Sequence, residues 1–427
     1  MNIDQAIRAL REGQFDETLQ KLYPGYKSDP DKYLRRFESL VQAYREHFQE
    51  PEAVHLFSAP GRIEVGGNHT DHQHGNVLAA AIDRDMIAAA GLNGSEKIRI
   101  YSIGYGGLEI NLDDLDPQEN EKETTASLLR GVTAEIKKTG YAVQGFDVCV
   151  LSDVPGGSGI SSSAAFEVLI GAVLNGLFCG NALSPVTLAK IGQYAEQHYF
   201  GKPSGLMDQT ASAVGGFVAI DFKDTSAPVI RAISAEQLAG EYSIFVIDSG
   251  SAHADLSNVY AGIPTEMRAA AACFGKEVLR DVDEKEFWAN IKRVREQIGD
   301  RGVLRTIHFF EENQRAVSQA AALEAGDLDG FLTLIKASAL SSFTHLQNVI
   351  ISGQTEHQDV AYALAAAEHA LKGRGAVRVH GGGFAGTILA FVPIDAAESF
   401  REEVDACLFP GACIKMSIRP IGCAQVL

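Results

Sequence analysis

The stretch LSDVPGGSGISSSAAFEVLIGAVLNGLF, residues 151–178, decides how this chain is interpreted. A β-rich run ends at Pro155, a glycine-rich turn follows, and Ser161, Ser162 and Ser163 precede an apolar helical segment. Glycines just before a helix N-terminus let backbone N–H groups converge on an anion, and the helix dipole favours negative charge there. A helix capped by serine after a glycine turn is the plainer interpretation. Because no Gly-Lys-Ser/Thr follows, this is not a Walker A loop. Three consecutive serines after the glycine turn are less common than a simple cap, so we favour phosphate binding.

A second glycine-rich stretch, LFSAPGRIEVGGNHTDHQHGN, covers residues 56–76. Its charged, amide and imidazole side chains are denser than a surface turn needs, although a solvated loop has a similar composition. His69, His72 and His74 suggest a metal site, but their spacing is not that of known zinc motifs and no Cys or Glu-x-x-His accompanies them.

The third stretch is VRVHGGGFAGTILAFV, residues 377–392, in which Gly381, Gly383 and Gly386 satisfy G-x-G-x-x-G. A dinucleotide fingerprint needs a helix directly afterwards, whereas residues 387–392 form a β-type run. The sequence therefore predicts a strand, a loop and a strand, with close backbone approach to a ligand or another loop as the use of the glycines.

Asp208 lies in KPSGLMDQTASAVGG, residues 202–216, at the start of an apolar segment. On its own, this carboxylate fits the N-cap of a helix equally well. The helix before it is predicted to begin at Ser184-Pro185, to run to Phe200 and to end at Gly201.

Composition limits the partners. The chain has 427 residues, with 37 Lys and Arg against 55 Asp and Glu, a formal charge of −18. This acidity argues against binding to nucleic acid or to an anionic membrane, because both need clustered cations. The six cysteines include no C-x-x-C pair and are expected to be reduced thiols. The N-terminus has no signal-peptide pattern and no segment is apolar enough to span a bilayer, so we expect a cytoplasmic protein, monomeric or weakly self-associating.

The order of helical and β-rich segments predicts an α/β (α+β) chain of two domains with a cleft between them. We expect a helical extension at residues 1–50, a first domain at 51–222 and a second at 223–427. The polar stretch around 223–228 is the best candidate boundary.

Taken together, the four stretches resemble the GHMP family of small-molecule kinases, and within it the galactokinases. PGRIEVGGNHTDHQHG is similar to the signature P-G-R-x-N-L-I-G-E-H-T-D-Y-x-x-G. PGGSGISSSAA is similar to the phosphate loop, GLMDQ to the segment of the catalytic aspartate and HGGGFAGT to the third motif. The resemblance runs from about Val54 to the C-terminus. It implies the two-domain GHMP kinase fold, with the site in the interdomain cleft, and Mg²⁺-dependent transfer of phosphate from ATP to the anomeric C1 hydroxyl of galactose.

The resemblance also implies roles for single residues. Asp208 matches the catalytic base, and Arg62 matches the arginine that neutralises the transferring phosphoryl group; an aspartate beside arginine has a lowered pKa and orients the hydroxyl more than it takes its proton. Sugar contacts are implied at Asn68, His69, Thr70, Asp71, Gly205 and Tyr260. Nucleotide contacts are implied at Ser102, Gly157, Ser158, Gly159, Ile160, Ser161, Ser162 and Ser163, and Mg²⁺ ligands at Ser163 and Glu196.

The positions at which this chain departs from the signature bear on which sugar it binds. The family's N-L-I-G-E-H is Glu64-Val65-Gly66-Gly67-Asn68-His69 here, so an amide replaces the glutamate expected near the sugar 6-OH. A 6-carboxylate would be repelled by glutamate but tolerated by Asn68, and His72, in place of the family's tyrosine, could pair with an anion. Plant galacturonate kinases resemble this pattern, so galacturonate or another C6-modified galactose is the alternative substrate. A non-catalytic sugar sensor is a third hypothesis, which the intact GISSSAA and Asp208 disfavour.

Overall fold

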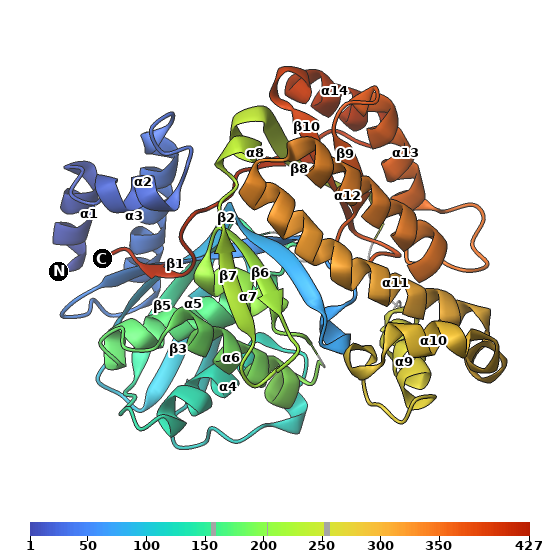
Figure 1. The fold of residues 1–427 in the computed structure, drawn as a ribbon. Helices are drawn as coiled ribbons and strands as arrows, with labels where there is room; N and C mark the ends of the chain where they lie inside the picture. The colour runs from blue at the N-terminus through green and yellow to red at the C-terminus, as the bar shows by residue number, and fades with distance from the viewer. Residues whose placement is uncertain (155–158, 203, 252–256) are drawn as a thin grey trace.

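The computed structural model describes residues 1–154, 159–202, 204–251 and 257–427. Two β-sheets, each covered by helices, form the architecture (Figure 1). This mixed α/β arrangement confirms the predicted fold class.

The first sheet has eight strands in the order β12-β1-β2-β5-β3-β4, with β6 beside β2 and β7 beside β6. All its pairs are antiparallel except β3 with β5. Its strands are β1 (His55–Gly66), β2 (Asn76–Leu92), β3 (Lys97–Ser102), β4 (Gly106–Asn111), β5 (Phe146–Ser152), β6 (Phe217–Asp221), β7 (Val229–Ile233) and β12 (Ala424–Gln425).

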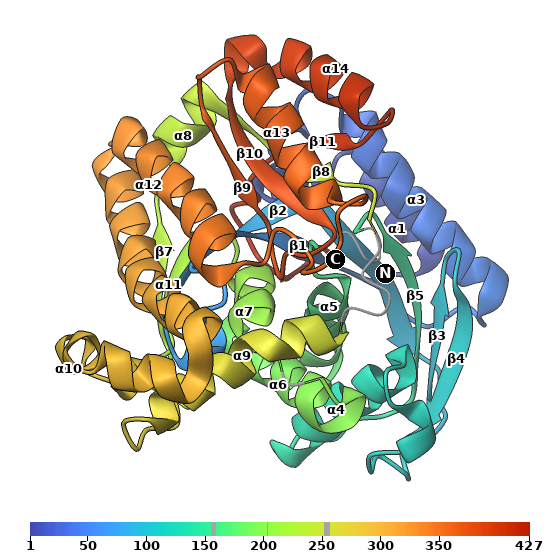
Figure 2. The same cartoon turned by 90° about the vertical axis from the view of Figure 1, so that its right-hand side faces the viewer.

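Both faces of this sheet are buried, each in a different core. Strand side chains alternate between the faces, so neighbouring residues of one strand enter different cores. On β2, Ala88 and Ala90 belong to the main core, whereas Ile87 and Ala89 belong to a second core formed with the N-terminal helices. One layer of helices therefore covers each face (Figure 2). The main core holds α4 (Thr125–Lys138), α5 (Ser162–Phe178), α6 (Pro185–Ala195) and α7 (Met207–Val214), and the second holds α1 (Ile3–Arg11), α2 (Asp16–Leu22) and α3 (Pro30–His47).

The second sheet has the antiparallel order β11-β8-β10-β9. Its strands are β8 (Tyr242–Asp248), β9 (Ala376–Val379), β10 (Thr387–Pro393) and β11 (Cys413–Met416). The helices of this half are α8 (Glu236–Glu241), α9 (Ser257–Ala272), α10 (Glu284–Ala289), α11 (Ile291–Ala325), α12 (Leu328–Ser341), α13 (Asp359–Leu371) and α14 (Ala397–Cys407). Helix α11 is kinked at Gly299 and reaches β1, β2 and β6 of the first sheet. None of the helices in the described part of the chain is long and apolar enough to cross a membrane.

Local sequence signals account for where several helices and strands begin and end. Ser184 caps α6 by accepting a hydrogen bond from the Thr187 N–H, and Pro185 follows as its first residue, as predicted. A π-helical turn, η3 (Glu196–Phe200), continues α6 and ends at Gly201 in the left-handed conformation. Strands β9 and β10 confirm the predicted strand-loop-strand.

The division into domains at residues 222 and 223 stays a prediction. In the structure, β6 and β7 lie on either side of that point and pair with each other in the first sheet. The C-terminal strand β12 also returns to the first sheet, beside β1.

Candidate active site

Residues from both halves of the chain meet at a cleft of about 740 Å³. Strand β1 and the loop after it, the segment before α7, helix α9 and the β9–β10 loop contribute its walls. The predicted residues that line it are Arg62, His69, Asp71, Gly159, Gly205, Asp208 and Tyr260.

Arg62 and Asp208 form a bidentate ion pair in this cleft. The Arg62 Nε donates to Asp208 Oδ1 at 2.7 Å, and Nη2 donates to Oδ2 at 2.6 Å. Arg62 Nη1 also donates to the Gly159 carbonyl at 2.5 Å, which connects the pair to the turn before α5. Burial opposes ionisation of Asp208, but Arg62 and the Ser161 hydroxyl, at 2.5 Å, lower its pKa to about 2. The aspartate is therefore a carboxylate at neutral pH.

Ser163 and Glu196 also meet, from the first turn of α5 and the start of η3. Ser163 Oγ donates to Glu196 Oε1 at 3.3 Å, and Lys202 Nζ lies 3.0 Å from the same oxygen. Gln209 donates to the other Glu196 oxygen at 2.9 Å and to Glu167 at 2.9 Å. A hydroxyl and a carboxylate that converge are hard oxygen donors of the kind that Mg²⁺ takes, although Lys202 and Gln209 contact the Glu196 oxygens here.

The loop after β1 holds His69, His72 and Asp71. His69 Nε2 donates to the Gly382 carbonyl at 3.0 Å, which leaves Nδ1 to accept from His72 Nε2 at 3.3 Å. Burial lowers the pKa of both imidazoles, so His72 carries no positive charge at neutral pH to pair with an anion. Burial also raises the pKa of Asp71, to about 6. A Cβ at position 205 would lie 2.1 Å from Asp71 Oδ2, so any larger residue there would displace this carboxylate.

Asn68 and Glu64 lie differently from what the signature suggested. The Asn68 side chain is fully buried, and its Nδ2 donates to Glu64 Oε1 at 2.8 Å and to the Gly381 carbonyl at 2.6 Å. Asn348 donates to Asn68 Oδ1 at 2.9 Å. Glu64, by contrast, lines the cleft, and the buried Arg378 donates to its Oε1 at 2.9 Å. Glu64 thus brings an acidic side chain to the cleft that is itself buried and paired with Arg378, and burial raises its pKa.

Two side chains of helix α11 form hydrogen bonds with the backbone of the same loop. His308 Nε2 donates to the Asn68 carbonyl at 2.9 Å, and the Gly67 N–H donates to Glu312 Oε1 at 3.1 Å. Both side chains are fully buried. Sequence analysis missed them, because single polar residues within a long helix carry no local motif.

The remaining predicted residues do not line the cleft in the described part of the chain, or are not described. The Thr70 hydroxyl contacts the Gly67 and Asn76 carbonyls and closes the loop. The Ile160 carbonyl accepts from the Arg62 N–H at 3.2 Å, and Ser162 begins α5. Ser102 ends β3 and is not among the residues that line the cleft. Gly157 and Ser158 lie outside the described residues.

Tyr260 lies on α9 at the cleft wall. Its hydroxyl donates to the Gly383 carbonyl at 2.7 Å, and its ring packs edge-on against Phe384. Position 382 must be a glycine beside this ring, because a Cβ there would lie 2.6 Å from Tyr260 Cε1.

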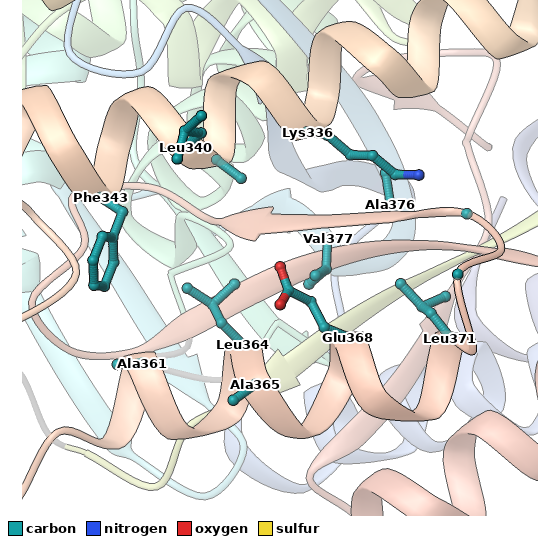
Figure 3. A pocket seen from close by; sticks show the side chains of 13 residues that line it. Lys336, Leu340, Phe343, Ala361, Leu364, Ala365, Glu368, Leu371, Ala376 and Val377 are labelled. Atoms are coloured by element: carbon teal, nitrogen blue, oxygen red, sulfur yellow. The ribbon is translucent and has the colours of Figure 1, made fainter.

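A second cavity, of about 540 Å³, lies between α12 and α13. Figure 3 shows Leu340, Leu364 and Val377 on its walls, with Lys336 and Glu368 as its charged side chains. None of the predicted residues lines this cavity in the described part of the chain.

The comparisons with known proteins agree with this geometry. Residues 42–92 match the family model of the galactokinase galactose-binding signature, and residues 127–216 match that of the GHMP kinase N-terminal domain. The galactokinase of Streptococcus suis is 30% identical over 375 residues, covering 86% of this chain and 92% of that protein. The galactokinase of Actinobacillus pleuropneumoniae serotype 3 is 32% identical over 371 residues, covering 85% and 91%. The chain belongs to the galactokinase family.

Solved structures support the same assignment. The crystal structure of Lactococcus lactis galactokinase complexed with galactose superposes with a TM-score of 0.78, at 26% identity, covering 91% of this chain and 99% of that one. The crystal structure of L. major mevalonate kinase in complex with R-mevalonate shares the fold only, at a TM-score of 0.59 and 14% identity, covering 88% of this chain and 100% of that one. Membership of the galactokinase family makes the chain a sugar kinase of the GHMP class, a class that uses ATP.

Proposed function

We propose that this protein transfers the terminal phosphoryl group of ATP to the C1 hydroxyl of galactose, giving galactose 1-phosphate and ADP. The observation that carries the proposal is the Arg62–Asp208 pair in the cleft, in a chain whose residues 42–92 match the galactose-binding signature. Phosphoryl transfer depends mainly on positioning and on charge stabilisation, and this pair supplies both.

Asp208 orients the C1 hydroxyl. Its carboxylate accepts a hydrogen bond from that hydroxyl and takes the proton as the new P–O bond forms. Because its pKa is only about 2, it is a weak base, and its main contribution is to hold the nucleophile in line. Arg62 keeps Asp208 ionised and neutralises charge on the transferring group.

We assign the phosphates of ATP to residues 157–163, which include the N-terminus of α5, with Ser102 as a further nucleotide contact. Residues Ser163 and Glu196 would hold Mg²⁺, which neutralises phosphate charge when bound. Lys202, whose ammonium group is 3.0 Å from Glu196, adds a positive charge beside this pair.

The sugar is assigned to the loop after β1. His69, Asp71, Gly205 and Tyr260 lie where they can face it, while Asn68 and Thr70 shape the loop from within. Galactose is favoured over galacturonate because a sugar carboxylate in this cleft would meet the Glu64 carboxylate as well as Asp71.

The test is release of ADP with galactose, galacturonate, galactosamine and 2-deoxygalactose. We expect turnover with galactose well above that with galacturonate. If a folded protein that binds ATP releases no ADP with any of these sugars, the result would favour a non-catalytic sugar sensor.

Asp208→Asn should lower kcat by about two to four orders of magnitude while ATP binding is retained. Turnover near that of the wild type would contradict the role of Asp208.

A further inference from the structure

The loop after β1 has an unusual backbone conformation on either side of Asn68. Gly67 has a φ of 85° and His69 a φ of 59°, both in the left-handed region. Glycine adopts this region readily, whereas a residue with a Cβ does so uncommonly. Such a residue keeps the conformation only where its surroundings fix it, and residues of this kind gather at functional sites. Because His69 lines the cleft, whatever fixes its backbone also determines where its imidazole lies.

Two fully buried side chains of α11 contact the peptide groups of this turn. Glu312 Oε1 accepts from the Gly67 N–H at 3.1 Å and from the Asn68 N–H at 3.5 Å. His308 Nε2 donates to the Asn68 carbonyl at 2.9 Å. That carbonyl belongs to the planar peptide group that precedes His69, so holding it fixes the plane from which the φ of His69 is measured.

Helix α12 in turn fixes the two side chains of α11, beside which it runs (Figure 1). Ser338 Oγ donates to Glu312 Oε1 at 2.6 Å, and the other Glu312 oxygen pairs with Arg315. Ser341 Oγ lies 2.9 Å from His308 Nδ1. Because His308 donates through Nε2, its Nδ1 accepts from the Ser341 hydroxyl. Both side chains are therefore held in the orientation that meets the loop.

We propose that His308 and Glu312 are positioning residues for the sugar: they hold the peptide groups on both sides of Asn68 and so place His69 at the cleft. The proposal rests on the proposed function, because it takes the loop after β1 to be where the sugar binds. Neither side chain lines the cleft in the described part of the chain, so both act through the loop. Residues that only anchored α11 would affect stability and leave galactose affinity unchanged.

The test compares Glu312→Met, Glu312→Gln and His308→Phe with Thr306→Val. Methionine and phenylalanine keep much of the buried volume and remove the acceptor or the donor. Glutamine keeps an acceptor oxygen for the Gly67 N–H but loses the charge that pairs with Arg315. Thr306 is the matched control, because it is fully buried on the same helix and its hydroxyl donates to a carbonyl of that helix.

The readouts are the affinities for galactose and for ATP, each by calorimetric titration, the KM values for both, kcat and Tm. We expect Glu312→Met and His308→Phe each to weaken galactose binding and to raise its KM about tenfold, because each leaves a buried group of the loop without its partner. Their ATP affinity should be unchanged. Glu312→Gln should keep most of the galactose affinity although its Tm falls, and Thr306→Val should match the wild type in both affinities.

Unchanged galactose affinity in folded His308→Phe, or in folded Glu312→Met, would overturn the proposal, as would galactose affinities that follow Tm across the four variants. If Glu312→Met does not fold, His308→Phe decides the matter, because it leaves the Glu312 contacts in place. A wild-type protein that binds galactose but releases no ADP would overturn the proposed function alone, and the galactose titration would still decide the roles of His308 and Glu312.

Discussion

Asp71 is expected to destabilise the ligand-free protein at neutral pH. Burial raises its pKa from 3.8 to about 6, so the folded protein carries a carboxylate that would be better solvated in the unfolded chain. The folded state binds this proton more tightly than the unfolded state, and stability therefore rises as pH falls from above 6 towards 4. A shift of about two units at about 1.4 kcal/mol per unit gives a ceiling of about 3 kcal/mol.

Asp71→Asn removes this cost. The amide oxygen can still accept from the His72 N–H, as Asp71 Oδ1 does at 2.8 Å. Because the side chain also faces the cleft, the cost is smaller than this ceiling. We therefore expect the variant to be more stable than the wild type by about 2 kcal/mol at pH 8, with the difference vanishing near pH 4. Urea unfolding without ligand, at one-unit steps of pH, measures it.

The matched control is Asp113→Asn, which removes an exposed carboxylate and should change stability by less than about 0.5 kcal/mol. In activity assays, Asp71→Asn should raise the KM for galactose, because a buried charge kept at a cost in stability is typical of a binding site. The reasoning is refuted if the variant is less stable at pH 8, or if the difference does not depend on pH.

Two further substitutions test residues that line the cleft where the sugar is assigned. Gly205→Ala would place a Cβ 2.1 Å from Asp71 Oδ2, so the carboxylate must move, and we expect a higher KM for galactose with unchanged ATP affinity. The control is Gly240→Ala, because no heavy atom lies within 4 Å of a Cβ at that position. Equal galactose KM values in the two variants would contradict the assignment of Gly205 to the sugar. Glu64→Gln should raise the ratio of kcat/KM for galacturonate to that for galactose about tenfold, since it removes a like charge from the cleft. An unchanged ratio in folded protein would exclude Glu64 as the determinant.

The sequence was most informative where a local pattern has a local cause. The serine cap and proline of α6, the glycine that ends η3 and the β-run after the third glycine-rich stretch could all be predicted, because each depends on neighbouring residues only. The resemblance to known kinases then brought together Arg62 and Asp208, which are 146 residues apart.

What could not be predicted are the long-range partners of β1 and of the loop after it. Arg378, His308 and Glu312 are single polar residues in otherwise ordinary elements, and only the fold brings them to the loop. Glu64 is different, because a signal was available. Strand periodicity places it on the same face as Arg62, two residues earlier, and that alternation points its carboxylate towards the cleft. The signature drew attention to Asn68 instead, whose side chain is buried.

The hydrogen bonds between the two halves of the molecule have a consequence for how it folds. The Glu64 N–H donates to His380 Nε2 at 3.0 Å, Arg378 donates to the Val65 carbonyl at 2.7 Å, and Asn68 donates to the Gly381 carbonyl. The first two bonds are buried and the third is partly buried, and leaving a buried polar group without a partner costs about 1–3 kcal/mol. Neither half can therefore complete its own interior without the other. Because the seam that forms the cleft carries these shared bonds, we expect the two halves to unfold in one cooperative transition, with the catalytic centre lost in the same step.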